Sequence, residues 1–147
     1  MFITGNTIRE EVFTFTPADG TPEINLLSGQ LRSFLLTTLS DRTMDLTFPQ
    51  QTTEELIAQH GLEPARMASM TEQEAQEPVI VGLWRDGTHT LIDGAHRRWF
   101  WASRGVSVLQ GWVVPEVVWR AFEFDPNHPS IVANFEDGTL LPQRLKK

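Results

Sequence analysis

Leu91-Ile92-Asp93-Gly94-Ala95-His96-Arg97-Arg98 contains the most informative pattern in this chain. The pattern indicates the end of an apolar strand, a turn, and the first residues of a helix. The first turn of a helix presents unpaired N–H groups and a partial positive charge, so it favours an anion. Arg97 adds a planar fork that matches phosphate oxygens, and His96 adds a second donor. The segment therefore predicts a phosphate-binding turn.

Strand and helix patterns alternate on both sides of this turn. Val79–Trp84 and Thr88–Ile92 are typical of strands, and Asp86-Gly87 between them is a type I′ hairpin signal. A helix is expected from Ala95 to Arg104, with Gly105 as its cap, followed by a strand over 108–114. The chain is long enough for one well-packed domain. We expect a single domain over 1–147, of α/β class, with a small mixed sheet flanked by helices.

Further elements are expected on both sides of this region. Thr52 with Glu55, and Thr71 with Glu74, form two capping boxes that predict helix starts. Pro64 favours a short helix from Pro64 to Ser69. The remaining patterns predict strands at 11–16 and 44–48, helices at 29–39 and from Pro115, and a terminal hairpin at Asp137-Gly138.

The composition excludes several classes of protein. The chain has no Cys, so it can hold neither a disulfide nor a zinc–thiolate site. Its two lysines are Lys146 and Lys147, which removes a Walker-type phosphate loop. No apolar run approaches the roughly 18 residues that a transmembrane helix needs, and the N-terminus lacks the features of a signal peptide. We expect a cytoplasmic protein with no membrane partner.

The order of these strands, turns and helices resembles the ParB/sulfiredoxin superfamily. Its members share a proline-led strand, a D-G hairpin, a G-x-H-R turn, a short helix ending in Gly, and another strand. Here these pieces are Pro78-Val79-Ile80-Val81, Asp86-Gly87, Asp93-Gly94-Ala95-His96-Arg97, Gly105 and Trp112-Val113-Val114. Residues 62–69 are similar to the L-D-P-A-K-x-x-S segment of sulfiredoxins. The resemblance covers about 62–124; residues 1–60 and 125–147 match nothing we can name.

Two departures limit what the resemblance implies. Sulfiredoxins carry an attacking cysteine where this chain has Ala95, so their chemistry is ruled out. ParB partition proteins continue into DNA-binding and dimerisation domains, for which the residues after Val114 are too few. The resemblance then implies a free-standing ParB-like domain of the phage or mobile-element type.

The resemblance also implies a ligand, a nucleoside triphosphate such as ATP or CTP with Mg²⁺. Its phosphates would rest on Gly94, Ala95, His96 and Arg97, with Arg66 and Ser69 closing the pocket. Asp93 is the candidate ligand for Mg²⁺. His96 and Asp93 are the candidate catalytic residues, with His96 as a proton donor, for phosphoryl transfer or hydrolysis. Whether the domain is an enzyme stays open.

Other interpretations of the same residues compete with this one. Asp93 could simply cap the helix, and Arg66 and Ser69 could lie on an exposed polar face. Arg97, Arg98 and Arg104 could bind DNA, as in a partition relative or a nuclease of the ParB-like type, although the net charge of −7 disfavours it. A third interpretation is a non-catalytic phage factor that binds a host protein through its N-terminal third. A homodimer is a further possible assembly.

Overall fold

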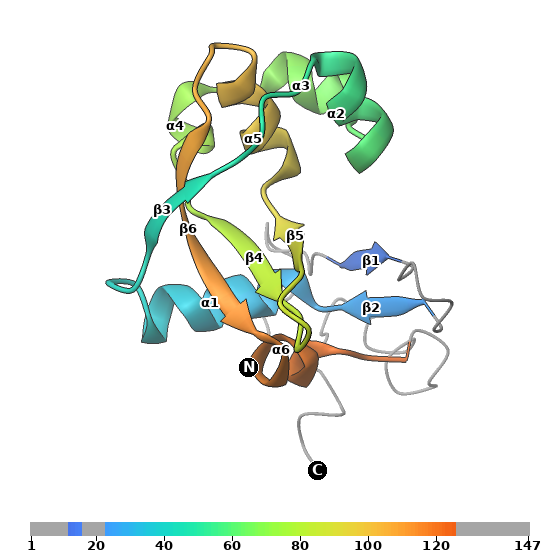
Figure 1. The fold of residues 1–147 in the computed structure, drawn as a ribbon, viewed down its shortest axis with the longest axis vertical. Helices are drawn as coiled ribbons and strands as arrows, with labels where there is room; N and C mark the ends of the chain where they lie inside the picture. Colours follow the sequence, from blue (N-terminus) through green and yellow to red (C-terminus); the bar gives the residue numbers. More distant parts are fainter. Residues whose placement is uncertain (1–11, 16–22, 126–147) are drawn as a thin grey trace, which may run out of the picture. The chain divides into compact units, whose positions relative to one another are not determined.

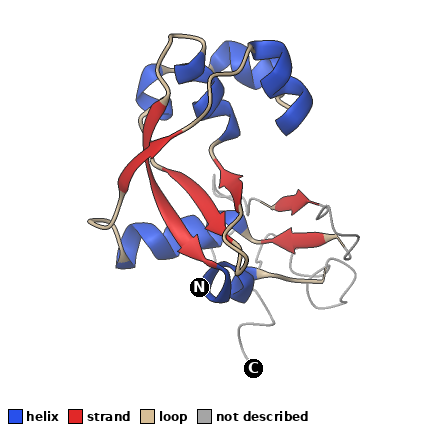
Figure 2. Ribbon diagram, in the orientation of Figure 1, coloured by secondary structure: helices blue, strands red, loops and turns tan. Residues whose placement is uncertain are grey.

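The computed structural model describes residues 12–15 and 23–125, and they fall into two compact units (Figure 1). Unit 1 combines residues 1–38 and 115–147, and unit 2 is Leu39–Val114. Figure 2 shows helices and strands in both units, so the predicted mixed α/β class is confirmed. No helix in the described ranges is long and apolar enough to cross a membrane. The hairpin predicted at Asp137-Gly138 lies outside these ranges.

Unit 1 has a two-stranded antiparallel sheet and helices from both ends of the chain. Its elements are β1 (Phe13–Phe15), β2 (Ile24–Leu26), α1 (Ser28–Thr38), α6 (Glu116–Trp119) and the 3₁₀ turn η1 (Arg120–Phe122). Backbone hydrogen bonds join β2 and the residue after it to the segment around η1: Leu27 donates to Phe122, and Phe124 donates to Asn25. The bounds of α1 confirm the helix predicted at 29–39 within one residue at each end.

Unit 2 contains the four-stranded sheet and the predicted phosphate-binding turn. The strand order is β3-β6-β4-β5, with bounds β3 (Met44–Thr47), β6 (Val108–Pro115), β4 (Val79–Leu83) and β5 (His89–Asp93). β3 is antiparallel to β6, and β5 is antiparallel to β4. The arrows of β4 and β6 run the same way in Figure 1, so the sheet is mixed, as expected.

The helices of unit 2 gather around α5 (Ala95–Ala102) at one end of this sheet (Figure 1). They are α2 (Thr53–His60), α3 (Pro64–Ser69) and α4 (Glu72–Ala75). Both predicted capping boxes are confirmed at the starts of α2 and α4.

Aromatic residues of α5 fix it against its neighbours. The indole N–H of Trp99 donates to Thr53 of α2, and that of Trp101 donates to the carbonyl of Ala75 in α4. Phe100 is buried between them. Neighbouring helical residues are turned about 100° from one another, so the three rings do not form one stacking platform.

The β4–β5 turn differs from the type I′ turn that Asp86-Gly87 predicts. Type I′ requires positive φ at both central residues, but no non-glycine residue in the described ranges has one. Gly87, with φ of 93°, instead ends a three-residue loop between Trp84 and Thr88, whose backbones are hydrogen-bonded. The carboxylate of Asp86 accepts two hydrogen bonds from Thr88 and stabilises the loop through its side chain.

Gly94 holds the start of α5 close to the sheet. Its φ is 115°, and a Cβ placed on it would lie 2.4 Å from Val79 Cγ1. Gly111 in β6 approaches the same residue, where an added Cβ would lie 2.6 Å from the carbonyl oxygen of Val79. Glycine at these positions therefore allows α5 and β6 to pack directly on the first residue of β4.

We expect Gly94→Ala to lower the free energy of unfolding by roughly 2–5 kcal/mol, because it combines backbone strain with a steric clash. Gly105→Ala is the matched control, since Gly105 has φ of 78° but open space around it. That control should lose only about 1 kcal/mol, the backbone contribution alone. Equal losses in denaturant unfolding of the two variants would contradict the packing role of Gly94.

Candidate functional site

The first turn of α5 lacks the side-chain cap that α2 and α4 possess. Its N-cap is Gly94, which has no side chain to accept a hydrogen bond, and its first turn contains no acidic residue. The first internal hydrogen bond runs from the N–H of Arg98 to the carbonyl of Gly94. The N–H groups of residues 95–97 precede this bond and are the donors that a helix start leaves for another acceptor.

Arg97 is buried and joins three parts of unit 2. Its Nη2 lies 3.0 Å from Oδ2 of Asp93, its Nη1 donates to the carbonyl of Pro78 at 2.9 Å, and Glu77 lies 3.9 Å away. The side chain of Arg97 is 8% exposed and that of Asp93 is 17% exposed. These contacts tie the start of α5 to the end of β5 and to the residue before β4.

The ion pair with Arg97 bears on two roles that the sequence suggests for Asp93, helix capping and Mg²⁺ binding. Asp93 does not cap α5, because the N-cap is Gly94 and the carboxylate of Asp93 turns to Arg97. A cation at Asp93 would face the Arg97 guanidinium, which already neutralises the carboxylate. Asp93 therefore does not fit the role of a Mg²⁺ ligand, and we derive no step through a metal ion. The geometry gives Arg97 a positioning role in the described fold.

His96 lies beside the start of α3. Its Nε2 accepts a hydrogen bond at 3.0 Å from the backbone N–H of Glu63, which is 33 residues earlier in the chain. An acceptor nitrogen on a neutral imidazole places the hydrogen on Nδ1, and that N–H has no partner among the described residues. His96 is half-buried, and Arg66 on α3 is exposed and close enough for its charge to act on His96. His96 therefore contacts the start of α3, and the charge of Arg66 on that helix acts on its imidazole.

Burial and neighbouring positive charges lower two histidine pKa values. Burial lowers the pKa of His96, and the charge of Arg66 lowers it further, while Glu63 opposes the change. Burial, Arg98 and His96 likewise lower the pKa of His60. Both imidazoles are therefore neutral near pH 7.

Ser69 is exposed at the end of α3. Its hydroxyl donates to the carbonyl of Arg66 at 3.3 Å, so it is held on its own helix. No hydrogen bond joins it to α5 among the described residues. The structure thus links Arg66, but not Ser69, to the turn at His96.

Arg98 is buried in a different environment from Arg97. The sequence suggested for Arg98 only a part in a basic patch that could bind DNA. Its guanidinium contacts His60, the carbonyl of Pro49 and the side chain of Gln51. These partners lie 38 to 49 residues away in the chain. No local motif could have revealed them, because the contacts form only when the segment before α2 folds over α5.

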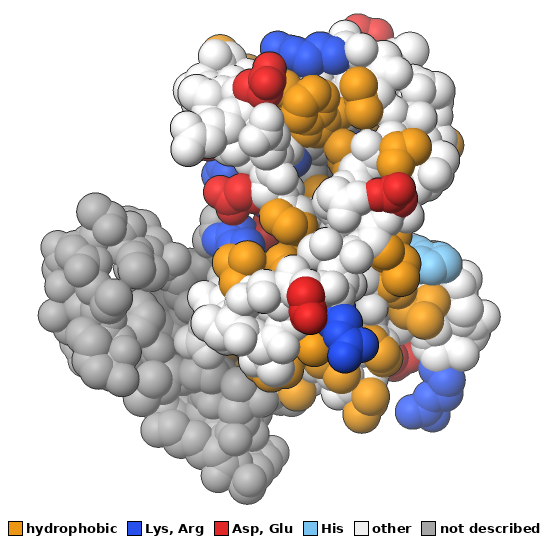
Figure 3. Space-filling model, turned by 90° about the vertical axis from the view of Figure 1, so that its left-hand side faces the viewer, with side chains coloured by type: hydrophobic (Ala, Val, Ile, Leu, Met, Phe, Trp, Pro, Cys, Tyr) orange, Lys and Arg blue, Asp and Glu red, His pale blue; other side chains and the backbone are white. Residues whose placement is uncertain are grey.

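The three arginines considered for DNA binding do not form one exposed patch. Arg97 and Arg98 are buried, whereas Arg104 is exposed and its guanidinium lies 3.5 Å from the ring centre of Phe100. On the face drawn in Figure 3, Lys and Arg side chains are separate groups with acidic side chains among them. This distribution does not favour the counter-ion displacement on which DNA affinity depends.

Comparisons of the chain with protein-family models, with curated proteins and with solved structures find no match. The resemblance to the ParB/sulfiredoxin superfamily therefore stays a prediction from the motifs around Gly94.

Arg97→Met and Asp93→Asn should each lower the free energy of unfolding by about 3 kcal/mol, because each removes one partner of a buried ion pair. The double variant should lose less than the sum, with a coupling of roughly 1–3 kcal/mol. Denaturant unfolding of the four proteins measures this cycle. Strictly additive losses would show that the pair does not join α5 to β5.

We expect the free energy of unfolding to fall as the pH drops below about 6.5, the ordinary histidine value. Because the folded-state pKa values of His60 and His96 are lowered, the unfolded chain binds protons first in this range. The stabilisation is complete above pH 6.5 and is lost as the pH falls towards the folded-state values. Replacing both residues with Gln should flatten the slope between pH 7 and 5.5, whereas His89→Gln, at an exposed position, should not.

Proposed function

We propose that unit 2 binds the phosphate groups of a nucleoside triphosphate, ATP or CTP, at the first turn of α5. The observation that carries the proposal is an uncapped helix start beside His96 and Arg66. Helices α2 and α4 have both a capping box and acidic residues in the first turn, whereas α5 has neither. Acidic residues stabilise a helix start, so their absence from the first turn of α5 leaves its N–H groups and the partial positive charge of the helix to an external anion.

His96 contributes a hydrogen-bond donor rather than a proton. With Nε2 accepting from Glu63, its Nδ1–H can donate to a phosphate oxygen. Protonation of His96 would break the bond from Glu63 and is opposed by the charge of Arg66. These features support binding by a neutral imidazole and argue against His96 as the general acid that the motif suggests.

Arg66 contributes the exposed positive charge of the site. No carboxylate lies within ion-pair distance of it among the described residues, although its charge also acts on Glu74. An exposed arginine can reorient to meet phosphate oxygens in a bidentate manner. Arg97 supports the site indirectly, because its ion pair fixes the turn on which the donors lie.

The nucleoside part of the proposal rests on the resemblance, since the contacts described above concern phosphate alone. Arg66 occupies the basic position of the segment similar to sulfiredoxins, and His96 occupies the G-x-H-R position. In this proposal Mg²⁺ accompanies the triphosphate in solution and has no ligand from Asp93.

Calorimetric titration with ATP, CTP and GTP, with and without Mg²⁺, tests the proposal. We expect saturable binding of at least one nucleotide by the unaltered protein. Arg66→Gln and His96→Gln should each weaken it about tenfold, the effect of losing roughly 1.4 kcal/mol from a charge-assisted or neutral hydrogen bond. In the His96→Gln variant the amide oxygen of the new side chain can still accept from Glu63, so the fold is preserved.

Arg42→Gln is the matched control, because Arg42 is a highly exposed arginine of the same unit. It should leave the affinity unchanged. No saturable binding to any nucleotide, or an equal loss in the Arg42 variant, would overturn the proposal.

A further inference from the structure

β3 lies at an edge of the sheet in unit 2, and among the described strands it pairs with β6 alone (Figure 1). The N–H of Phe48, just after β3, donates to the carbonyl of Ser107 at 2.8 Å. Backbone groups of residues two apart point the same way in an antiparallel ladder, so those of Leu46 and Phe48 face β6. Those of Asp45 and Thr47 face outward, and no described residue forms a hydrogen bond with them.

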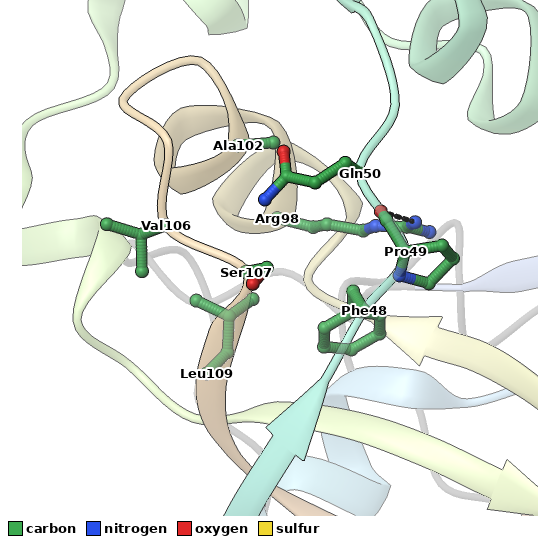
Figure 4. Close-up of a pocket in the computed structure, with 8 residues that line it drawn as sticks. All are labelled: Phe48, Pro49, Gln50, Arg98, Ala102, Val106, Ser107 and Leu109. Atoms are coloured by element: carbon green, nitrogen blue, oxygen red, sulfur yellow. Dashed lines mark hydrogen bonds between the residues drawn. The ribbon is translucent and has the colours of Figure 1, made fainter.

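One face of β3 presents an apolar row that continues past the end of the strand. Side chains alternate along a strand, so Met44, Leu46 and Phe48 share this face. Met44 is 51% exposed, and the other two are half-buried. Leu46 covers Gly111 of β6, where an added Cβ would lie 2.8 Å from Leu46 Cδ1. Phe48 and Leu109 line the same hollow, as Figure 4 shows. The row is thus supported by β6 on its inner side and has no described strand on its outer side.

The edge formed by β3 lacks most of the devices that prevent strand pairing. Its charge is on the opposite face, where the carboxylate of Asp45 accepts a hydrogen bond from the side-chain amide of Gln110. Within its bounds β3 contains no lysine, no proline and no bulge. The other edge strand, β5, has a bulge opposite Ile80 and Val81, which disturbs its ladder. Of the two edges, β3 is therefore the one suited to a further strand.

We propose that two copies of this chain pair through β3 as antiparallel strands, with the two-fold axis at Leu46. Asp45 of one copy then lies opposite Thr47 of the other, and each of these outward-facing pairs exchanges both of its N–H···O bonds. On the other face Leu46 meets its own copy, and Met44 meets Phe48, a thioether against a ring. The inference is independent of the proposed phosphate site, because it uses neither the first turn of α5 nor α3.

Neighbouring registers are less favourable than this one. An axis at Asp45 would place two carboxylates directly opposite each other. An axis at Thr47 would place Pro49, which has no N–H, opposite Asp45 and so remove hydrogen bonds. With the axis at Leu46, the outward N–H groups of β3 all meet carbonyls and the apolar row meets an apolar row. This self-complementarity identifies a second copy as the partner, and the two-fold symmetry closes the assembly at a dimer.

Sedimentation velocity at protein concentrations from about 10 µM to 1 mM tests the proposal, because a short strand gives a weak and reversible dimer. We expect the unaltered protein to shift from monomer to dimer and to form no larger species. A monomer at the highest concentration, or growth beyond the dimer, would overturn the proposal. A monomer that instead binds an unrelated extended peptide at the amides of Asp45 and Thr47 would assign the edge to a foreign strand and would equally overturn it.

Charge changes at Thr47 test the register. Thr47→Asp places a carboxylate opposite Asp45 of the second copy and should weaken the dimer about tenfold, since the repulsion occurs twice. Thr47→Lys should tighten the dimer by a similar factor. The double variant Asp45→Thr/Thr47→Asp restores the pair and should dimerise as the unaltered protein does. Gln59→Asp and Gln59→Lys, at an exposed position of α2, are the matched controls for net charge and should leave the affinity unchanged. A dimer insensitive to Thr47→Asp would overturn the assignment to β3.

A disulfide locates the axis directly. The chain has no Cys, so Leu46→Cys introduces a single thiol in each copy. In the proposed register the two thiols face each other in a non-hydrogen-bonded pair, whose short Cβ separation suits a disulfide. With oxidised glutathione as the oxidant, we expect Leu46→Cys to form a cross-linked dimer at least tenfold faster than Val108→Cys, at an exposed position of β6. Equal rates for the two variants would contradict an axis at Leu46.

Discussion

The buried ion pair between Arg97 and Asp93 is the interaction on which the arrangement of unit 2 depends. A guanidinium removed from water requires an acceptor for its charge and its N–H groups. Arg97 finds them at the last residue of β5 and at the carbonyl of Pro78, just before β4. One side chain thus fixes where α5 begins relative to two strands, and Gly94 lets the backbone approach Val79 closely enough for this to happen.

The same pair determines what the start of α5 can do. Because Asp93 turns to Arg97, it cannot cap the helix, and the first-turn N–H groups have no side-chain acceptor from the N-cap. His96, in this turn, faces the start of α3. There the backbone of Glu63 fixes its orientation and Arg66 supplies an exposed positive charge. A fixed turn with uncapped N–H groups is suited to an anionic ligand because its donors need no rearrangement on binding. The proposed function follows from this combination.

Features set by neighbouring residues could be predicted from the sequence. The capping boxes at Thr52 and Thr71, and the helix that begins at Pro64, are decided within a few residues and are confirmed. The hairpin at Asp86-Gly87 could also be predicted, but the predicted type I′ turn is wrong. The side chain of Asp86 instead stabilises a three-residue loop.

The site was predictable only in part, since tertiary contacts decide what each charged residue does. The motif correctly indicated a strand, a turn and a helix around Gly94, and it pointed to His96 and Arg66. It could not reveal that Arg97 is neutralised by Asp93 while Arg98 is surrounded by neutral groups. Both are arginines in one helical turn, and only the packing of distant segments distinguishes them.

The most direct test of the central claim is an amide-resolved titration of the protein with inorganic triphosphate. If the first turn of α5 is the phosphate site, the largest saturable shifts will occur at the backbone N–H groups of Ala95, His96 and Arg97, together with the imidazole of His96. Shifts that are absent there, or that are larger at the starts of the capped helices α2 and α4, would contradict the account.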